Sequence, residues 1–331
     1  MSIRPVRTST IEPFCLDSSQ GRDLMANILI AGCGYVGTAL GLRLAAAGHV
    51  VWGIRRAAEG LPAGIRHLAA DLTDPATLQN LPPALDVVFY TAAPNAADEA
   101  AYRAIYVDGL RHVLQALVRQ HQSPRRVLLT SSTAVYAQSA GEWVDETSPT
   151  EPQHFTGRCV LEGERVLLDG PFPATVLRLG GIYGPGRSSL IERVRQGLVT
   201  CREGPPLYTN RIHRDDCAGA LQHLMALPQP DARYIGVDHE AADYCDLLRW
   251  LAAQLGAPPP RVEASSGMDS RRHRTNKRCR HDKLIGSGYV FHYPTFREGY
   301  ATLLAQASAE ASSSPDGRDG QAQVSDRTLV P

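Results

Sequence analysis

The sequence predicts an α/β protein, with a doubly wound parallel sheet followed by a smaller C-terminal lobe. Short β-branched runs alternate with stretches of helical period, which is the pattern of βαβ units with helices on both faces of a sheet. The chain has 331 residues, 43% of them hydrophobic and 21% charged. It can therefore bury a large core, and it has the length of about two domains. A glycine-rich turn joins the first predicted strand to the first predicted helix.

The elements of the sheet follow from these patterns in chain order. Strands are expected at 28–31, 50–54, 87–90, 127–130 and 175–179. Helices are expected at 36–47, 98–120 and 161–168. After Gly180 the pattern loosens into Gly- and Pro-rich connections, with further helices at 217–227 and 244–255.

The glycine-rich turn has the spacing G-x-G-x-x-G between a predicted strand and a predicted helix. Gly32 permits a tight turn, Gly34 lets the backbone approach a pyrophosphate, and Gly37 lets the helix pack on the strand. The phosphates would lie at the positive end of the helix dipole. We therefore predict a Rossmann-type dinucleotide site that includes Tyr35 and Val36; the alternative is a turn that binds nothing.

The end of the second predicted strand indicates which dinucleotide is bound. An acidic residue about 20 residues past the glycines would bind the ribose of NAD. Here the chain carries Arg55 and Arg56, whose guanidinium groups suit a 2′-phosphate, so NADP is preferred over NAD. The alternative is that both arginines belong to a solvated loop. Asp71 could contact the adenine amine, or it could cap a helix, a role for which Asp74 competes.

The hydrophobic pattern also sets the domain boundaries. Residues 1–24 have no hydrophobic period and are predicted to be a disordered extension. Residues 25–180 form the predicted NAD(P)-binding domain, and 181–306 the substrate-binding lobe, from which late elements can return to the sheet. Residues 307–331 contain few large apolar side chains and are predicted to be a disordered tail.

Composition restricts the partners. The 34 basic and 34 acidic residues cancel, so no net field attracts nucleic acid or an anionic membrane, and a small-molecule substrate is expected. The seven cysteines are scattered without a C-x-x-C pair, which argues against a disulfide framework and a zinc site; no metal is predicted. No apolar signal segment precedes residue 25, and a cytoplasmic location is expected.

The segment 271–283 is strongly basic, which raises nucleic-acid binding as one interpretation. No aromatic residue lies within it to stack on a base. An anionic substrate or a solvated loop is the favoured interpretation.

Six motifs, in order along the chain, resemble the extended short-chain dehydrogenase/reductase family of NAD(P)-dependent epimerases, dehydratases and reductases. They lie at 32–37, 71–72, 90–93, 129–136, 177–186 and 211–216. The segments 276–279 and 293–299 are similar to those of bacterial epimerase-like proteins of poorly defined substrate. The resemblance covers about residues 25–304 and places Leu72, Ala92 and Ala93 with Asp71 against the cofactor.

The family carries out its chemistry with a serine, a tyrosine and a lysine four residues after that tyrosine. By resemblance, Ser132 is the serine that would hydrogen-bond the reacting carbonyl; its other interpretation is a serine that satisfies backbone at a strand end. The same alignment places Thr156 at the tyrosine and Val160 at the lysine. The first lysine of the chain is Lys277, so no shift of register restores the pair.

Other groups could then supply the proton. Tyr136 or Tyr183 could present a phenol from neighbouring loops, or both could simply pack those loops, and Arg158 could place positive charge near the ribose. Arg211 could reach a substrate phosphate, by resemblance. Asp215 and Asp216 are expected to cap the helix at 217–227.

Two functions remain open on this sequence. The first is an NAD(P)-dependent oxidoreductase or epimerase acting on a polar substrate that resembles a nucleotide sugar. The second is an NAD(P)H-binding sensor or regulatory protein that has lost turnover. A homodimer through the helices at 98–120 and 162–168 is a further expectation from the resemblance.

Overall fold

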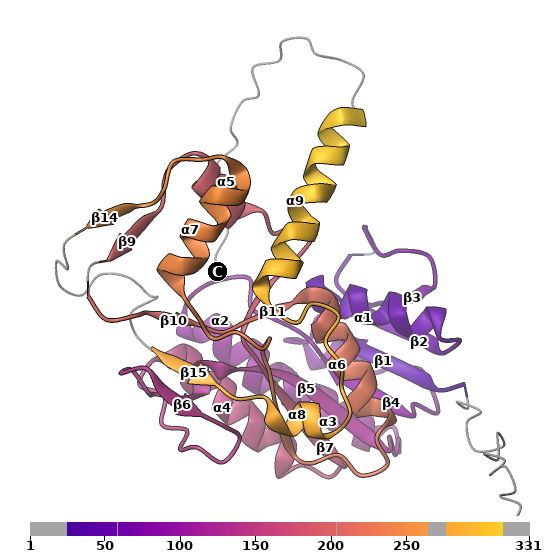
Figure 1. Ribbon diagram of the computed structural model, residues 1–331. Coiled ribbons are helices and arrows are strands. Elements are labelled where there is room, and N and C mark those ends of the chain that lie inside the picture. The colour runs from indigo at the N-terminus through magenta and orange to yellow at the C-terminus, as the bar shows by residue number, and fades with distance from the viewer. Residues whose placement is uncertain (1–24, 58, 203, 264–275, 314–331) are drawn as a thin grey trace, which may run out of the picture.

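The computed structural model describes residues 25–57, 59–202, 204–263 and 276–313, and a seven-stranded parallel sheet lies at its centre (Figure 1). Its strands are β1 (Asn27–Ala31), β2 (Val50–Arg55), β3 (Ile65–Ala69), β4 (Val87–Tyr90), β5 (Arg126–Ser132), β7 (Ala174–Leu179) and β12 (Arg233–Gly236). They are ordered β12-β7-β5-β4-β1-β2-β3, and every neighbouring pair is parallel. The strand order reverses between β1 and β4, as in a doubly wound Rossmann fold, which confirms the predicted fold class.

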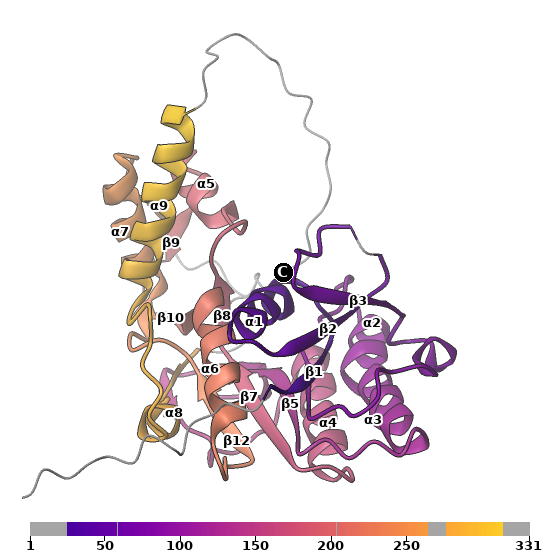
Figure 2. The same ribbon diagram turned by 90° about the vertical axis from the view of Figure 1, so that its right-hand side faces the viewer.

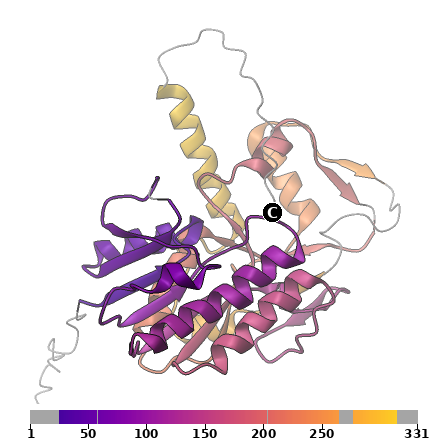
Figure 3. The same ribbon diagram turned by 180° about the vertical axis from the view of Figure 1, so that it is seen from behind.

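Helices cover both faces of this sheet (Figures 2 and 3). One face carries α1 (Tyr35–Ala46) and α6 (Arg214–Ala226), which pack on each other. The other face carries α2 (Glu99–Arg103), a π-helical turn η2 (Ala104–Gly109), α3 (Leu110–Arg119) and α4 (Phe155–Leu168). Each face has its own buried apolar cluster, with Ile28 and Ile30 of β1 in one and Leu29 in the other. The alternation along β1 therefore holds both helical layers to the sheet.

The five predicted strands and the predicted helices are all present, with ends that differ by a few residues. Two differences affect the walls of the candidate site. The helix expected at 98–120 is interrupted by η2, and α4 begins at Phe155, six residues before its predicted start. Two strands of the sheet, β3 and β12, are additional to these five; β12 comes from beyond residue 180 and returns to the sheet beside β7.

The second lobe rises above one end of the sheet and has its own core (Figure 1). Its helices are α5 (Ser189–Arg195), α7 (Tyr244–Leu255) and α9 (Phe296–Ser313). Three short two-stranded pairs form within the chain after residue 180. They are β8 (Gly181–Tyr183) with β11 (Arg211–His213), β9 (Thr200–Arg202) with β14 (Arg261–Glu263), and β10 (Tyr208–Thr209) with β13 (Ala242–Asp243). Strand β6 (Glu142–Val144) pairs with β15 (Lys277–Cys279), and α8 (Asp282–Gly286) comes next in the chain. The remaining short turns are η1 (Pro75–Leu78) and η3 (Thr133–Val135).

Two expectations about the later chain need correction. The tail predicted from residue 307 begins too early, because α9 continues to Ser313. The basic stretch is not simply a solvated loop, because Lys277 and Cys279 are buried in β15. Its residues 271–275, the extension 1–24 and the segment 314–331 lie outside the described residues.

The described residues show two absences that concern membranes and metals. None of the helices there combines the length and the apolar character needed to cross a bilayer. Within the same residues, no group of three or more His, Cys, Asp or Glu side chains could hold a metal ion.

Candidate functional site

A cleft of about 610 Å³ lies at the carboxyl ends of the central strands. It lies where the strand order reverses between β1 and β4, the place where open α/β sheets bind their ligands. Ten of the eleven predicted cofactor residues line it: Gly32, Gly34, Tyr35, Val36, Arg55, Arg56, Asp71, Leu72, Ala92 and Ala93. Gly37, the eleventh, lies behind the glycine turn. Of the residues predicted for catalysis or substrate, Ser132 alone is in the lining.

The glycine turn has three separate requirements for glycine. Gly32 has a φ of +89°, and a Cβ atom there would lie 2.4 Å from the backbone of Ala92. A Cβ on Gly37 would lie 2.6 Å from Thr91 Oγ1, so a side chain would separate α1 from the sheet. A Cβ on Gly34 would meet no protein atom closer than 3.9 Å, and would instead occupy the cleft.

The start of α1 offers its backbone N–H groups to the cleft. Its N-cap is Gly34, no side chain caps it, and no acidic residue occupies its first turn. Uncapped N–H groups together with the helix dipole bind anions such as phosphate. The bare Gly34 leaves the room that such a ligand needs, so these residues fit the diphosphate of a dinucleotide.

The other end of the cleft carries the predicted ribose- and adenine-binding residues. Arg55 and Arg56 are exposed at the carboxyl end of β2. The Asp71 carboxylate accepts hydrogen bonds from the N–H (2.9 Å) and the hydroxyl (2.7 Å) of Thr73, which lower its pKa. Asp74, and not Asp71, caps the following turn η1. Asp71 is therefore left at the cleft wall.

Ser132 ends β5 and caps the short turn η3. Its Oγ accepts a hydrogen bond from Ala134 N–H at 3.1 Å, which leaves its own O–H free to donate into the cleft. The preceding residue, Ser131, donates to Glu164 at 2.5 Å. The carboxyl end of β5 is thus held by two hydrogen bonds, one from Ser131 to Glu164 and one from Ala134 to Ser132.

Tyr136 does not reach this cleft, contrary to the prediction that it presents a phenol there. Its side chain is fully buried, its hydroxyl donates to the Asp145 carbonyl at 2.7 Å, and it accepts from Arg178 at 2.8 Å. Arg178 also makes a two-pronged ion pair with Glu164, at 2.9 and 2.7 Å. Burial raises the pKa of Tyr136. These contacts make Tyr136 part of a buried network behind Ser132, which agrees with the packing alternative.

By resemblance, Thr156 and Val160 of α4 stand at the positions of the family's tyrosine and lysine. Neither residue lines the cleft. Thr156 Oγ1 lies 3.0 Å from His154 Nδ1, in the first turn of the helix. Val160 is buried in an apolar cluster. Arg158 points to the surface, where it donates to the Gln153 carbonyl (2.7 Å) and pairs with Glu99 (3.3 Å), so it does not place charge in the cleft.

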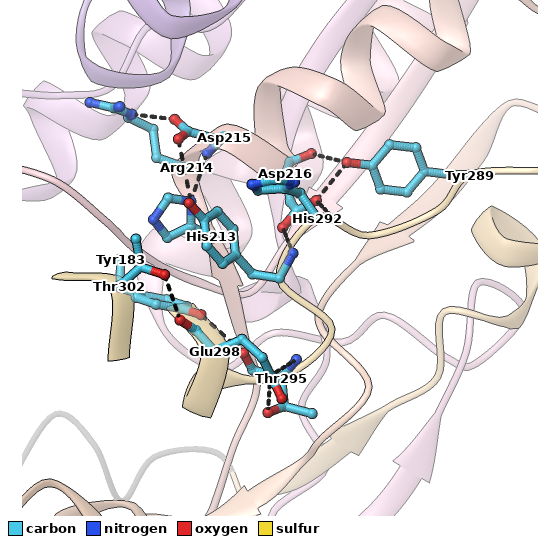
Figure 4. A network of polar contacts seen from close by, with 11 residues as sticks. Tyr183, His213, Arg214, Asp215, Asp216, Tyr289, His292, Thr295, Glu298 and Thr302 are labelled. Carbon is cyan, nitrogen blue, oxygen red and sulfur yellow. Dashed lines mark hydrogen bonds and ion pairs between the residues drawn. The ribbon is translucent and has the colours of Figure 1, made fainter. Parts of the chain in front are cut away.

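Tyr183 is buried in the second lobe, against the expectation that it faces substrate. Its ring stacks on Tyr300 at 4.5 Å and meets His213 edge to face at 5.3 Å. Its hydroxyl donates weakly to the Thr295 carbonyl, and burial raises its pKa (Figure 4). Tyr183 therefore packs the loop after β8, the second of its two predicted roles.

Asp215 and Asp216 lie in the first turn of α6 and are not its N-cap, contrary to the prediction. The helix begins three residues earlier, and His213 is its N-cap through Nδ1 (Figure 4). Asp216 is fully buried and accepts from the Tyr289 hydroxyl (2.8 Å) and from His292 N–H (2.7 Å). Its role is to tie the segment before α9 to α6.

Arg211 lies beside a second cavity of about 290 Å³, lined also by Leu190, Leu207, Tyr208, Thr209 and Tyr244. One guanidinium nitrogen donates to the Tyr300 hydroxyl at 3.1 Å, while Nε is buried without a partner in the described residues. Asp238 is the nearby carboxyl group that acts on Tyr300 and Arg211, and burial raises its pKa to about 8. At neutral pH Asp238 is then mostly uncharged, and the charge of Arg211 stays available to an anion.

The cleft lining also includes residues that the sequence analysis did not single out, among them the two tyrosines Tyr102 and Tyr106. Both belong to the segment predicted as one regular helix, in which they look like ordinary members of an apolar face. Their rings lie 5.8 Å apart, and Tyr102 packs edge to face on Phe155 at the start of α4.

Comparisons with known proteins agree with this geometry. The family model described as the NAD dependent epimerase/dehydratase family matches residues 28–231. The chain is similar in structure to a candidate NAD-dependent epimerase/dehydratase from Methylobacillus flagellatus, with a TM-score of 0.70 and 36% identity over 86% of this chain and 99% of that one.

Two relatives of this chain carry more specific names. The 3-diazoavenalumate denitrifying reductase of a Streptomyces species is 29% identical over 256 residues, which are 71% of this chain and 83% of that protein. The dTDP-6-deoxy-L-talose 4-dehydrogenase (NAD(P)(+)) of Kitasatospora kifunensis is 32% identical over 262 residues, which are 74% of this chain and 75% of the relative.

Proposed function

Because the chain belongs to the NAD-dependent epimerase/dehydratase family, we propose that it is an NADP-preferring oxidoreductase or epimerase acting at a carbinol centre of a polar substrate. The observation that carries this proposal is the cleft itself, whose walls include the uncapped start of α1, the bare Gly34 and the Arg55–Arg56 pair. When bound, the nicotinamide cofactor supplies or takes the hydride. The Ser132 hydroxyl donates a hydrogen bond to the reacting oxygen of the substrate.

The preference for NADP rests on Arg55 and Arg56. Changing both to Ala is expected to weaken NADPH binding about 100-fold or more, because each charge-assisted hydrogen bond to the 2′-phosphate contributes about 1.5–3 kcal/mol and about 1.4 kcal/mol corresponds to a tenfold change. NADH binding should change little, since NADH lacks that phosphate. Titration followed by nicotinamide fluorescence measures both constants.

Arg66→Ala is the matched control for this pair. Arg66 lies on the neighbouring strand β3, over the ring of Trp52, and is outside the cleft lining. Equal NADPH affinity in the Arg55→Ala/Arg56→Ala variant and in Arg66→Ala would contradict the assignment.

The substrate is proposed to be anionic and to resemble a nucleotide sugar. Support comes from Arg211, whose Nε lacks a partner among the described residues beside the second cavity, and from the dTDP-sugar dehydrogenase among the relatives. Arg211→Ala is expected to weaken binding of deoxythymidine diphosphate about 10-fold in calorimetry. Arg249→Ala is the control, because Arg249 pairs with Asp246 on the surface of α7 and is outside the lining of that cavity. Equal affinity in the two variants would rule out Arg211 as the anion site.

One observation favours a second candidate function. Neither Thr156 nor Val160 lines the cleft, so α4 contributes no acid to it at these two positions. The chain would then bind NAD(P)H as a sensor or regulatory protein. Consumption of NADPH with a carbonyl substrate separates the two functions, because a sensor binds the nucleotide without oxidising it.

The homodimer expected from the sequence stays a prediction. The face on which it would form is the outer side of α3 and α4, where Val118 is half exposed. A shallow, largely apolar hollow lined in part by Leu114, Val118, Val166 and Pro171 lies there.

A further inference from the structure

Tyr106 lies in the π-helical turn η2, between α2 and α3. Such turns insert one residue into a helix, which rotates the side chains beyond it, and they often occur at functional sites. Here the turn is held by the Tyr90 hydroxyl, which donates to the Ile105 carbonyl at 2.5 Å. The π-helical turn that carries Tyr106 is therefore held by a hydrogen bond from the central strand β4.

The main chain of Tyr106 lies directly against α4. A Cβ on Gly163 would be 2.4 Å from the Tyr106 carbonyl oxygen, so this approach needs glycine at that position of α4. The Tyr106 ring packs against the buried cluster that contains Val135, Val160 and Leu161. It thus lies between the turn after Ser132 and the stretch of α4 that carries Thr156 and Val160.

Tyr106 also lines the 610 Å³ cleft, together with Thr130, Ser131 and Ser132. Tyr106 and Ser132 therefore both line the cavity in which the cofactor is proposed to bind. We propose that Tyr106 is the proton donor of this site and takes the place of the phenol that the family carries at the position of Thr156. This inference rests on the proposed oxidoreductase function.

The surroundings of Tyr106 keep its phenol protonated and also make it a weak acid, so its role as donor depends on its position beside the reacting oxygen. Burial and the neighbouring Tyr102 phenol raise the pKa of Tyr106, and no hydrogen bond contributes to lowering it. The phenol is therefore protonated at neutral pH, as carbonyl reduction requires. Among the described residues, no lysine lines the cleft to favour the ionised form of this phenol, so proton transfer in either direction is expected to be slower than with a phenol assisted by lysine.

The proposed reduction conserves atoms and electrons. With NADPH bound, the carbonyl carbon would accept a hydride, and the C=O π electrons would move to the oxygen. That oxygen takes the Tyr106 proton, which yields the alcohol, NADP⁺ and a phenolate. Solvent returns the proton to the phenolate.

The test compares the Tyr106→Phe variant with the wild-type protein. Removal of the phenol hydroxyl is expected to lower kcat about 10²- to 10⁴-fold, with the dissociation constant of NADPH within about threefold of wild type. The carbonyl probes are a deoxythymidine-diphosphate 4-keto-6-deoxy sugar and 2,3-butanedione. Tyr234→Phe is the control, because its hydroxyl accepts from Asp231 N–H outside the cleft lining.

A second measurement does not depend on turnover. With ¹³Cζ-labelled tyrosine, the NMR signal missing from Tyr106→Phe identifies Tyr106, and this signal is expected to shift when NADPH is added while that of Tyr234 does not. An unshifted signal at saturating NADPH would overturn the placement of Tyr106 at the cofactor.

The remaining outcomes distinguish this inference from the function on which it rests. Full turnover in Tyr106→Phe overturns the assignment and leaves the oxidoreductase function standing. The same conclusion follows if Tyr102→Phe loses turnover while Tyr106→Phe keeps it. If the wild-type protein binds NADPH but reduces neither probe, the catalytic assignment fails and the sensor function is favoured. If NADPH does not bind, both proposals fail.

Discussion

Replacement of Gly32 by alanine is expected to abolish dinucleotide binding and to destabilise the fold. Gly32 has a φ of +89°, and the added Cβ would lie 2.4 Å from both the N and the Cα of Ala92. These are backbone atoms just after the central strand β4, so they cannot move without displacing the carboxyl end of that strand. We expect NADPH affinity to fall more than about 100-fold, and the free energy of unfolding to fall by about 3 kcal/mol or more.

Gly48 provides a matched control for this change. Its φ of +88° is nearly the same, but a Cβ there would have no atom within 4 Å. Gly48→Ala therefore experiences the backbone strain alone, about 1 kcal/mol, and should bind NADPH normally. Urea denaturation and NADPH titration of both variants separate steric collision from backbone strain. Wild-type affinity in Gly32→Ala would contradict the described geometry of the turn.

Glu164→Gln is expected to have the largest effect on stability outside the glycine turn. Glu164 is fully buried, accepts a hydrogen bond from the Ser131 hydroxyl, and accepts two more from Nε and Nη2 of the equally buried Arg178. Glutamine removes the negative charge and leaves the arginine uncompensated, which typically costs about 3–5 kcal/mol. The loss should appear as a lower urea midpoint with an unchanged m-value.

The neighbouring Glu162 shows what the same change does at the surface. Glu162 pairs with Arg103 at 2.9 Å, but both side chains are more than one third exposed. Glu162→Gln should therefore cost less than about 1 kcal/mol. If Glu164→Gln lowered the free energy of unfolding no more than Glu162→Gln, the buried network behind Ser132 would not stabilise the carboxyl end of β5 as described.

Features encoded by local pattern were predictable. The strand Val87–Tyr90 is a run of four apolar residues and has the bounds expected from the sequence. The glycine spacing indicated the start of α1 and most of the cleft lining, because the requirement for glycine arises within a few residues of the turn. Strand β12 was missed, since its four residues have no distinguishing pattern and are defined by pairing with β7.

Features set by distant contacts could not be predicted. Asp216 looks like a capping residue in the sequence, but its partners are 73 to 77 positions away. Tyr136 comes after Ser132 at the spacing of a family motif, and only the tertiary structure shows that Arg178 and Asp145 hold it in the core. Tyr106 was overlooked because a helical pattern does not reveal an inserted π-turn.

The central claim is that the cleft between β1 and β4 binds a nicotinamide dinucleotide. Titration of the wild-type protein with NADPH and with NADH, followed by nicotinamide fluorescence, tests it most directly. The structure predicts saturable binding of one equivalent per chain, tighter for NADPH than for NADH. Absence of saturable binding by either nucleotide would contradict this claim.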